Sequence, residues 1–158
     1  MAKINYLKLI ASIIICLGIG SFGGFATASS VSTWYVTLNK PFFNPPSWLF
    51  GPVWTLLYIL MGISLYLVWS KKLKPNVQKK ALGLFGIQLI LNFFWSLIFF
   101  GLRNPLLAFV EIVLLWVSIL FTIIYFWRVS KPAASLLIPY ILWVSFASVL
   151  NLAIVVLN

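Results

Sequence analysis

The chain has 158 residues, of which 63% are hydrophobic and only 8% are charged. Soluble domains carry about 25% charged and 45–50% apolar residues, so this composition excludes an ordinary soluble protein and indicates a membrane protein. Eleven basic residues stand against one acid, Glu111, and lie between apolar runs, so we expect membrane topology, and not nucleic-acid binding, to account for the net charge of +10.

The sequence also lacks the residues of most enzyme sites. It has no histidine, and its single cysteine, Cys16, lies within an apolar run. One acid and one thiol supply neither a metal-ligand set nor an acid–base pair. We therefore expect no metal site and no catalytic residue of a conventional hydrolase or redox enzyme.

Five apolar runs follow one another along the chain, each long enough to cross a hydrocarbon core of ~30 Å as a helix. They predict helices at about residues 9–28, 47–69, 81–102, 106–127 and 133–157. Only the first connection, 29–46, is long, and short links between antiparallel helices predict a compact bundle. The sequence thus predicts an all-α bundle of five transmembrane helices, forming a single membrane domain over residues 1–158.

The first run has an alternative interpretation. Lys3 and Lys8 precede it and Ala-Thr-Ala (26–28) ends it, which also fits a cleaved signal peptide. However, Gly20 and Gly24 are four residues apart and give one helix face two small residues, which lets another helix approach closely. A cleaved segment has no use for such a face, so we favour a retained helix. Its glycines could pack inside the bundle or form a dimer interface, and we favour packing inside the bundle.

The connection at 29–46 is rich in proline and aromatic residues. Pro41, Pro45 and Pro46 each fix φ and remove a backbone donor, so the loop is expected to be stiff. Pro46-Ser47 indicates the start of the second helix, and Pro75 is expected to act as a helix stop just beyond its end.

Basic residues predict the orientation in the membrane. One side of the predicted bundle holds only Lys40 and Arg103, whereas the other holds nine basic residues: Lys3, Lys8, Lys71, Lys72, Lys74, Lys79, Lys80, Arg128 and Lys131. This bias predicts a cytoplasmic N-terminus, with the C-terminus and the 29–46 loop outside. We expect the membrane to be the inner (plasma) membrane of a prokaryotic cell.

Several polar side chains fall inside the predicted helices, where lipid offers no hydrogen-bond partner. For Gln88, Glu111 and Asn151 we expect hydrogen bonds between helices. A bare carboxylate would be costly, so Glu111 should be protonated or hydrogen-bonded. A proton-coupled transporter centred on Glu111 would need a second titratable site, which the sequence does not offer.

Eight tryptophans are several times the ordinary usage for a chain of this length. Those at the ends of the runs suit the membrane interface: Trp48, Trp69 and Trp127. Others lie well inside the runs, as lipid-facing bulk or as the lining of a pocket: Trp54, Trp95, Trp116 and Trp143. A pocket lined by tryptophan and asparagine, here Asn92, suits a flat and largely apolar ligand.

Three stretches resemble the motifs of one family. Residues 34–62, WYVTLNKPFFNPPSWLFGPVWTLLYILMG, are similar to the signature of the TspO/MBR family, the tryptophan-rich sensory proteins of bacteria and the mitochondrial translocator protein. Residues 88–96 (QLILNFFWS) and 139–151 (PYILWVSFASVLN) are similar to its third- and fifth-helix motifs. An acid at Glu111 also fits, and the resemblance covers nearly the whole chain.

The resemblance implies a five-helix bundle whose 29–46 loop forms a lid over a pocket. Members of the family bind porphyrins such as protoporphyrin IX, and isoquinoline or benzodiazepine drugs, and commonly form homodimers. Carried over by position, the implied pocket residues are Trp54, Asn92, Trp95, Trp143, Phe146 and Ala147. The implied lid residues are Trp34, Tyr35, Pro41, Pro45 and Pro46.

Three functions follow as alternatives. The favoured one is tetrapyrrole binding with a sensing, regulatory or transport role, in which the porphyrin is a ligand and no cofactor is obligatory. The others are light-dependent porphyrin degradation and a structural or regulatory role in a membrane complex. The partners expected are membrane lipids, a porphyrin or a similar flat apolar molecule, and a second copy of the chain. Sterol binding is not predicted, because Tyr140 is followed by no Lys or Arg to complete the weak cholesterol motif.

Overall fold

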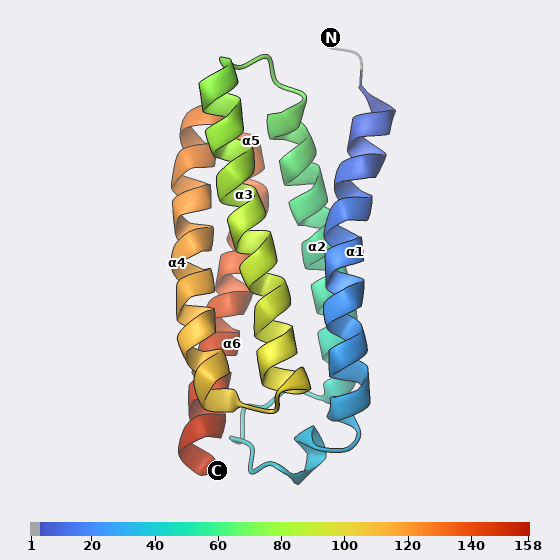
Figure 1. Cartoon of the computed structure of the whole chain (residues 1–158), viewed down its shortest axis with the longest axis vertical. Helices are drawn as coiled ribbons and strands as arrows, with labels where there is room; N and C mark the ends of the chain where they lie inside the picture. Colours follow the sequence, from blue (N-terminus) through green and yellow to red (C-terminus); the bar gives the residue numbers. More distant parts are fainter. Residues whose placement is uncertain (1–3) are drawn as a thin grey trace.

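The computed structural model describes residues 4–158, so Lys3, counted above among the inner charges, lies outside the described part. Its regular structure there is helical throughout (Figure 1). The elements are α1 (Tyr6–Val31), the 3₁₀ turn η1 (Tyr35–Thr37), α2 (Ser47–Trp69), α3 (Pro75–Ser96), the π turn η2 (Leu97–Gly101), α4 (Pro105–Val129), α5 (Lys131–Leu136) and α6 (Ile138–Leu157).

In the described part of the chain, five segments are long and apolar enough to cross a membrane, which confirms the predicted number of spans. α1, α2 and α4 are three of them, α3 with η2 forms one over Pro75–Gly101, and α5 with α6 forms one over Lys131–Leu157. The C-terminus and the loop between α1 and α2 lie at the same end of the bundle, opposite the N-terminus (Figure 1). We call this the loop end.

Pro75 begins a helix, although it was expected to act as a stop. α2 has the predicted bounds, but α3 starts at Pro75 and not at 81. Proline is well tolerated in the first turn of a helix, where its missing N–H has no partner to lose, and Lys74 before it is extended with ψ 140°. Lys79 and Lys80 are therefore helical, with stems that can lie along the apolar surface.

The last span is divided in two. α5 ends at Leu136, and α6 begins at Ile138, with Pro139 in its first turn. Proline has no N–H to donate to the preceding turn, which accounts for a break at this point. The predicted single helix at 133–157 is thus a short helix followed by a longer one.

The contact between α1 and α2 depends on two glycines. A Cβ added at Gly20 would lie 2.3 Å from the ring of Tyr58, and one at Gly62 would lie 2.6 Å from the Cα of Ile13. By contrast, a Cβ at Gly24 would meet no atom within 4 Å. The expectation that Gly20 and Gly24 both pack inside the bundle is therefore right for Gly20 and wrong for Gly24, where α1 stands away from α2.

Buried polar groups connect the other helices. Asn151 accepts a hydrogen bond from Trp95 Nε1 at 3.1 Å and donates to the carbonyl of Pro105 at 2.8 Å, which confirms the interhelical role expected of it. Gln88 and Glu111 are buried, but within residues 4–158 their side chains have no hydrogen-bond partner. That expectation is wrong for these two residues. Asn92 lies one turn from Gln88, but its side-chain oxygen and nitrogen form hydrogen bonds with Tyr58 and Tyr140.

Alanine substitutions at the glycines should separate tight packing from open space. Gly62→Ala should destabilise the protein by roughly 1–3 kcal/mol, because the new methyl group meets the backbone of α1. Gly24→Ala is the matched control: it adds the same group to a helix without a clash, so it should be neutral or slightly stabilising. Thermal unfolding of the purified protein in detergent measures both, and equal melting temperatures for the two variants would refute this account of the α1–α2 contact.

Candidate functional site

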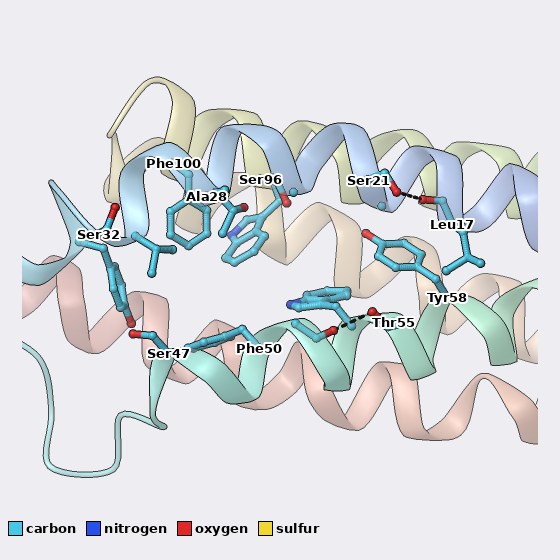
Figure 2. Close-up of a pocket in the computed structure, with 18 residues that line it drawn as sticks. Leu17, Ser21, Ala28, Ser32, Ser47, Phe50, Thr55, Tyr58, Ser96 and Phe100 are labelled. Carbon is cyan, nitrogen blue, oxygen red and sulfur yellow. Dashed lines mark hydrogen bonds between the residues drawn. The ribbon is translucent and has the colours of Figure 1, made fainter.

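A cavity of about 460 Å³ lies between α1 and α2 near the loop end (Figure 2). α1 forms one wall with mainly small and hydroxyl residues, and α2 forms the opposite wall with Phe50, Trp54 and Tyr58. The end of α3 and η2 add Trp95 and Phe100. Gly24 lines the cavity, which explains why a side chain there would meet nothing.

Aromatic rings form much of the cavity wall. Trp54 stacks on Tyr58 with 5.7 Å between the ring centroids, and its indole lies 6.4 Å from that of Trp95. Trp95 stacks in turn on Phe99 at 5.5 Å. This arrangement places flat apolar faces beside a space large enough for a small molecule, since ligand pockets commonly measure about 300–1,000 Å³.

Asn92 lies behind this wall and lines neither this cavity nor the second one described below. Its Oδ1 accepts a hydrogen bond from the hydroxyl of Tyr58, and its Nδ2 donates to the hydroxyl of Tyr140 at 2.8 Å. All three residues are buried. Asn92, a predicted pocket residue on α3, therefore holds the cavity residue Tyr58 of α2 in place. The same amide also bonds Tyr140, so this network connects α2, α3 and α6.

A second, much smaller cavity of about 20 Å³ borders the first. The two share Trp54, Trp95 and Phe100, and α6 adds Trp143 and Ala147 to the smaller one alone. Trp143, Ala147 and Asn151 line it together, as their spacing along one helix face predicts.

Phe146 lies outside both cavities. Its ring packs on Trp143 at 5.4 Å and on Phe43 of the loop at 6.3 Å. It thus connects α6 to the loop. Of the six predicted pocket residues, the structure places Trp54 and Trp95 in the main cavity, Trp143 and Ala147 beside it, and Asn92 and Phe146 behind or above it.

The α1 wall of the cavity is not among the residues predicted from the sequence. Residues 17, 20, 21, 24, 27, 28 and 31 of α1 all line it, and they recur at the three- and four-residue steps of one helix face. That periodicity was available in the sequence. The glycines within it were interpreted only as a packing surface, although a stripe of small residues can equally leave space.

The loop between α1 and α2 closes one end of the main cavity through Tyr35. This side chain is 3% exposed, and its ring lies 5.9 Å from Phe100 and 6.2 Å from Phe99. Its hydroxyl donates to Asn44 Oδ1 at 2.6 Å. Burial raises the pKa of Tyr35 to about 12, so the phenol is a neutral donor at neutral pH.

The other predicted lid residues do not line the cavity. Trp34 packs edge-on against Phe99 at 5.7 Å, and the three prolines, Pro41, Pro45 and Pro46, belong to the stretch that leads into α2. Only Tyr35 of this predicted set reaches the cavity.

Two sets of polar contacts hold the loop. The ammonium group of Lys40 donates to the carbonyls of Tyr35 at 2.8 Å and Leu38 at 3.0 Å, which keeps the loop folded on itself. Asn39 exchanges hydrogen bonds with Asn158 at the end of α6, at 2.9 Å and 3.0 Å. The loop is therefore fastened to the last helix of the bundle.

No residue that lines either cavity carries a charge. Within residues 4–158 there is also no group of three His, Cys, Asp or Glu side chains that could hold a metal ion. The site is thus suited to a flat, mainly apolar molecule held by ring contacts and a few hydroxyl groups.

The chain is similar in sequence to one family of known proteins. The model of the TspO/MBR family matches residues 12–157. The chain is 53% identical over 154 residues to the tryptophan-rich protein TspO of Archaeoglobus fulgidus, covering 98% of this chain and 99% of that protein. It is 43% identical over 120 residues to the translocator protein of Homo sapiens, covering 75% and 70%. It is 34% identical over 125 residues to the tryptophan-rich sensory protein of Cereibacter sphaeroides, covering 79% and 77%.

The family match and the five membrane-crossing segments support the same assignment. Both extend over nearly the whole chain, and the alignments also cover most of the length of each relative. The chain therefore belongs to the TspO/MBR family and is an integral membrane protein.

Proposed function

We propose that this protein binds tetrapyrroles such as protoporphyrin IX in the cavity between α1 and α2, and that binding serves sensing, regulation or transport. One observation carries the proposal: the uncharged cavity of about 460 Å³ has Trp54, Tyr58 and Trp95 along its wall. Stacked and tilted indole rings suit a large planar ring system, which buries much apolar area against them. The porphyrin is a ligand in this proposal, and no cofactor is required.

The names of the relatives support a sensing or transport role. One relative is called a tryptophan-rich sensory protein and another a translocator protein. Both names fit a membrane protein that responds to a small molecule or moves it. We further propose a homodimer, as the family resemblance implies.

A second candidate is light-dependent degradation of the bound porphyrin. Trp54, Tyr58 and Trp95 are readily oxidised side chains, and all three line the cavity. A photochemical reaction would need no acid–base pair. A role as a subunit of a larger membrane complex is the third alternative, and it requires no ligand in the cavity.

The loop at 32–46 is proposed as the lid of this pocket; it is shorter than the predicted 29–46 because α1 continues to Val31. Ser32 and Tyr35 of this loop line the cavity, and the Asn39–Asn158 pair fastens its outer side. The stiffness expected from three prolines fits a cover that keeps its shape when it moves.

Porphyrin titration tests the proposed pocket. Quenching of tryptophan fluorescence by protoporphyrin IX should report saturable binding, and Trp54→Ala should weaken it by about fivefold or more because a stacking surface is lost. Trp127→Ala is the matched control, since Trp127 is 48% exposed on α4 and lines neither cavity. Equal affinity in all three proteins would remove Trp54 from the site, and no binding to the wild type would favour the complex subunit.

The same titration run in the light and in the dark separates the first two candidates. Loss of porphyrin absorbance only in the light, abolished by Trp54→Phe while binding remains, would favour the enzyme. Stable absorbance under illumination would favour a receptor or carrier.

The fastening of the lid can be tested by hydrogen exchange. Asn158→Ala removes both hydrogen bonds to Asn39, so the Asn39 amide should exchange about fivefold faster. Val156→Ala is the control, because Val156 is 76% exposed in the same turn of α6 and truncating it leaves those bonds intact. Unchanged exchange at Asn39 in Asn158→Ala would show that the loop is held elsewhere.

We also propose a cytoplasmic N-terminus in the inner membrane of a prokaryotic cell. Among residues 4–158, Lys71, Lys72 and Lys74 stand at the end opposite the loop, together with most other basic residues. A periplasmic-type reporter such as alkaline phosphatase should then be active when fused after Asn158. Activity of only a cytoplasmic reporter at that position would reverse the orientation.

A further inference from the structure

The polar groups of the main cavity differ between its two ends. Within the body of the membrane-crossing helices, the hydroxyls of Ser21, Thr27 and Thr55 each donate to a carbonyl four residues earlier in their own helix, at 2.8, 3.1 and 2.8 Å. The Tyr58 hydroxyl donates to Asn92. These groups turn only oxygen lone pairs toward a ligand.

A carboxylate would find few partners among these inner groups. It accepts hydrogen bonds and donates none, so hydroxyls that have already used their proton cannot satisfy it. The unused inner donors within the described residues are the Trp54 indole N–H and the Ser96 hydroxyl, and each offers one neutral hydrogen bond. An ionised group placed there would lose its hydration without charge compensation.

The loop end of the cavity is different. Ser32 follows the last residue of α1 and Ser47 is the first residue of α2, so both stand where the membrane-crossing helices end. Both line the cavity, and neither hydroxyl donates to another group in residues 4–158. Figure 2 shows them together at one end, with Leu17 and Tyr58 at the other. Hydroxyl donors thus coincide with the ends of the membrane-crossing helices, where a membrane protein meets the aqueous interface.

We propose that the cavity holds an amphipathic, planar carboxylic acid in one orientation. The uncharged ring system lies against Trp54 and Trp95, and the carboxylate lies at the loop end, where Ser32 and Ser47 donate to it. This rests on the proposed tetrapyrrole binding and adds the direction in which the ligand sits. The site then prefers acids whose charge is confined to one edge of the molecule.

A cycle of ligand and protein variants tests the orientation. The ligands are protoporphyrin IX and its dimethyl ester, which share a ring system and differ only in the carboxylate groups. The Ser32→Ala/Ser47→Ala double variant should bind the acid about fivefold more weakly and the ester within about twofold of the wild type, because hydrogen bonds to a charged group are lost only with the acid. Ser29→Ala is the matched control, because the Ser29 hydroxyl donates to the carbonyl of Ala26 in its own helix at 3.1 Å and Ser29 lines neither cavity; it should change neither affinity.

An added negative charge supplies a second measurement. Ser47→Asp places a negative charge at the loop end, so it should weaken binding of the acid more than the alanine change does and leave the ester unaffected. Ser47 is exposed, and thermal unfolding of each variant in detergent confirms that it is folded.

The outcomes separate this inference from the proposed function. If Ser96→Ala weakens the acid selectively and the Ser32/Ser47 variant does not, the ligand sits the other way round and the orientation is overturned. Equal losses for acid and ester in the Ser32/Ser47 variant also overturn it, because the serines then only shape the cavity. If neither porphyrin binds to the wild type, the proposed function fails together with the inference.

Discussion

The structure depends on one requirement: polar groups at membrane depth must find partners inside the protein, because lipid supplies none. Tyr58 shows how this shapes the bundle. Its hydroxyl donates to Asn92, which donates in turn to Tyr140, so one chain of hydrogen bonds joins α2, α3 and α6. Its ring also fills the space that Gly20 leaves on α1. Four helices are thus positioned by a single side chain and its partners.

The same residue determines where the cavity begins. On one side of Tyr58, Gly20 and Gly62 allow α1 and α2 to approach until there is no room for a methyl group. On the other side, Gly24 and Gly51 face open space, and the helices stand apart. The ring of Tyr58 forms the inner end of the cavity, and Trp54 stacks on it from the loop side. Close packing in one half of the α1–α2 contact therefore supports the open half.

Hydropathy was sufficient to predict the number of spans and the bounds of α2, because those depend on the length of apolar runs. Pro75 was misinterpreted because a proline just after one helix and a proline at the start of the next look the same in sequence. The resemblance implies Trp54, Trp95 and Asn92 alike as pocket residues. In the structure Trp54 and Trp95 line one cavity, whereas Asn92 holds Tyr58 from behind. Such a distinction depends on the direction of a side chain, and residue spacing alone does not determine it.

The hydroxyl groups of the cavity follow from the same requirement as the rest of the bundle. A serine or threonine within a membrane helix satisfies its proton most simply at the carbonyl one turn earlier, as Ser21 and Thr55 do. A cavity built between two such helices is consequently rich in oxygen lone pairs and poor in donors. Among the described hydroxyls of the cavity, those of Ser32 and Ser47 donate to no helix carbonyl, and both stand where the membrane-crossing helices end. The difference between the two ends of the pocket therefore arises from how membrane helices satisfy their own side chains, and any ligand with one charged edge would experience it.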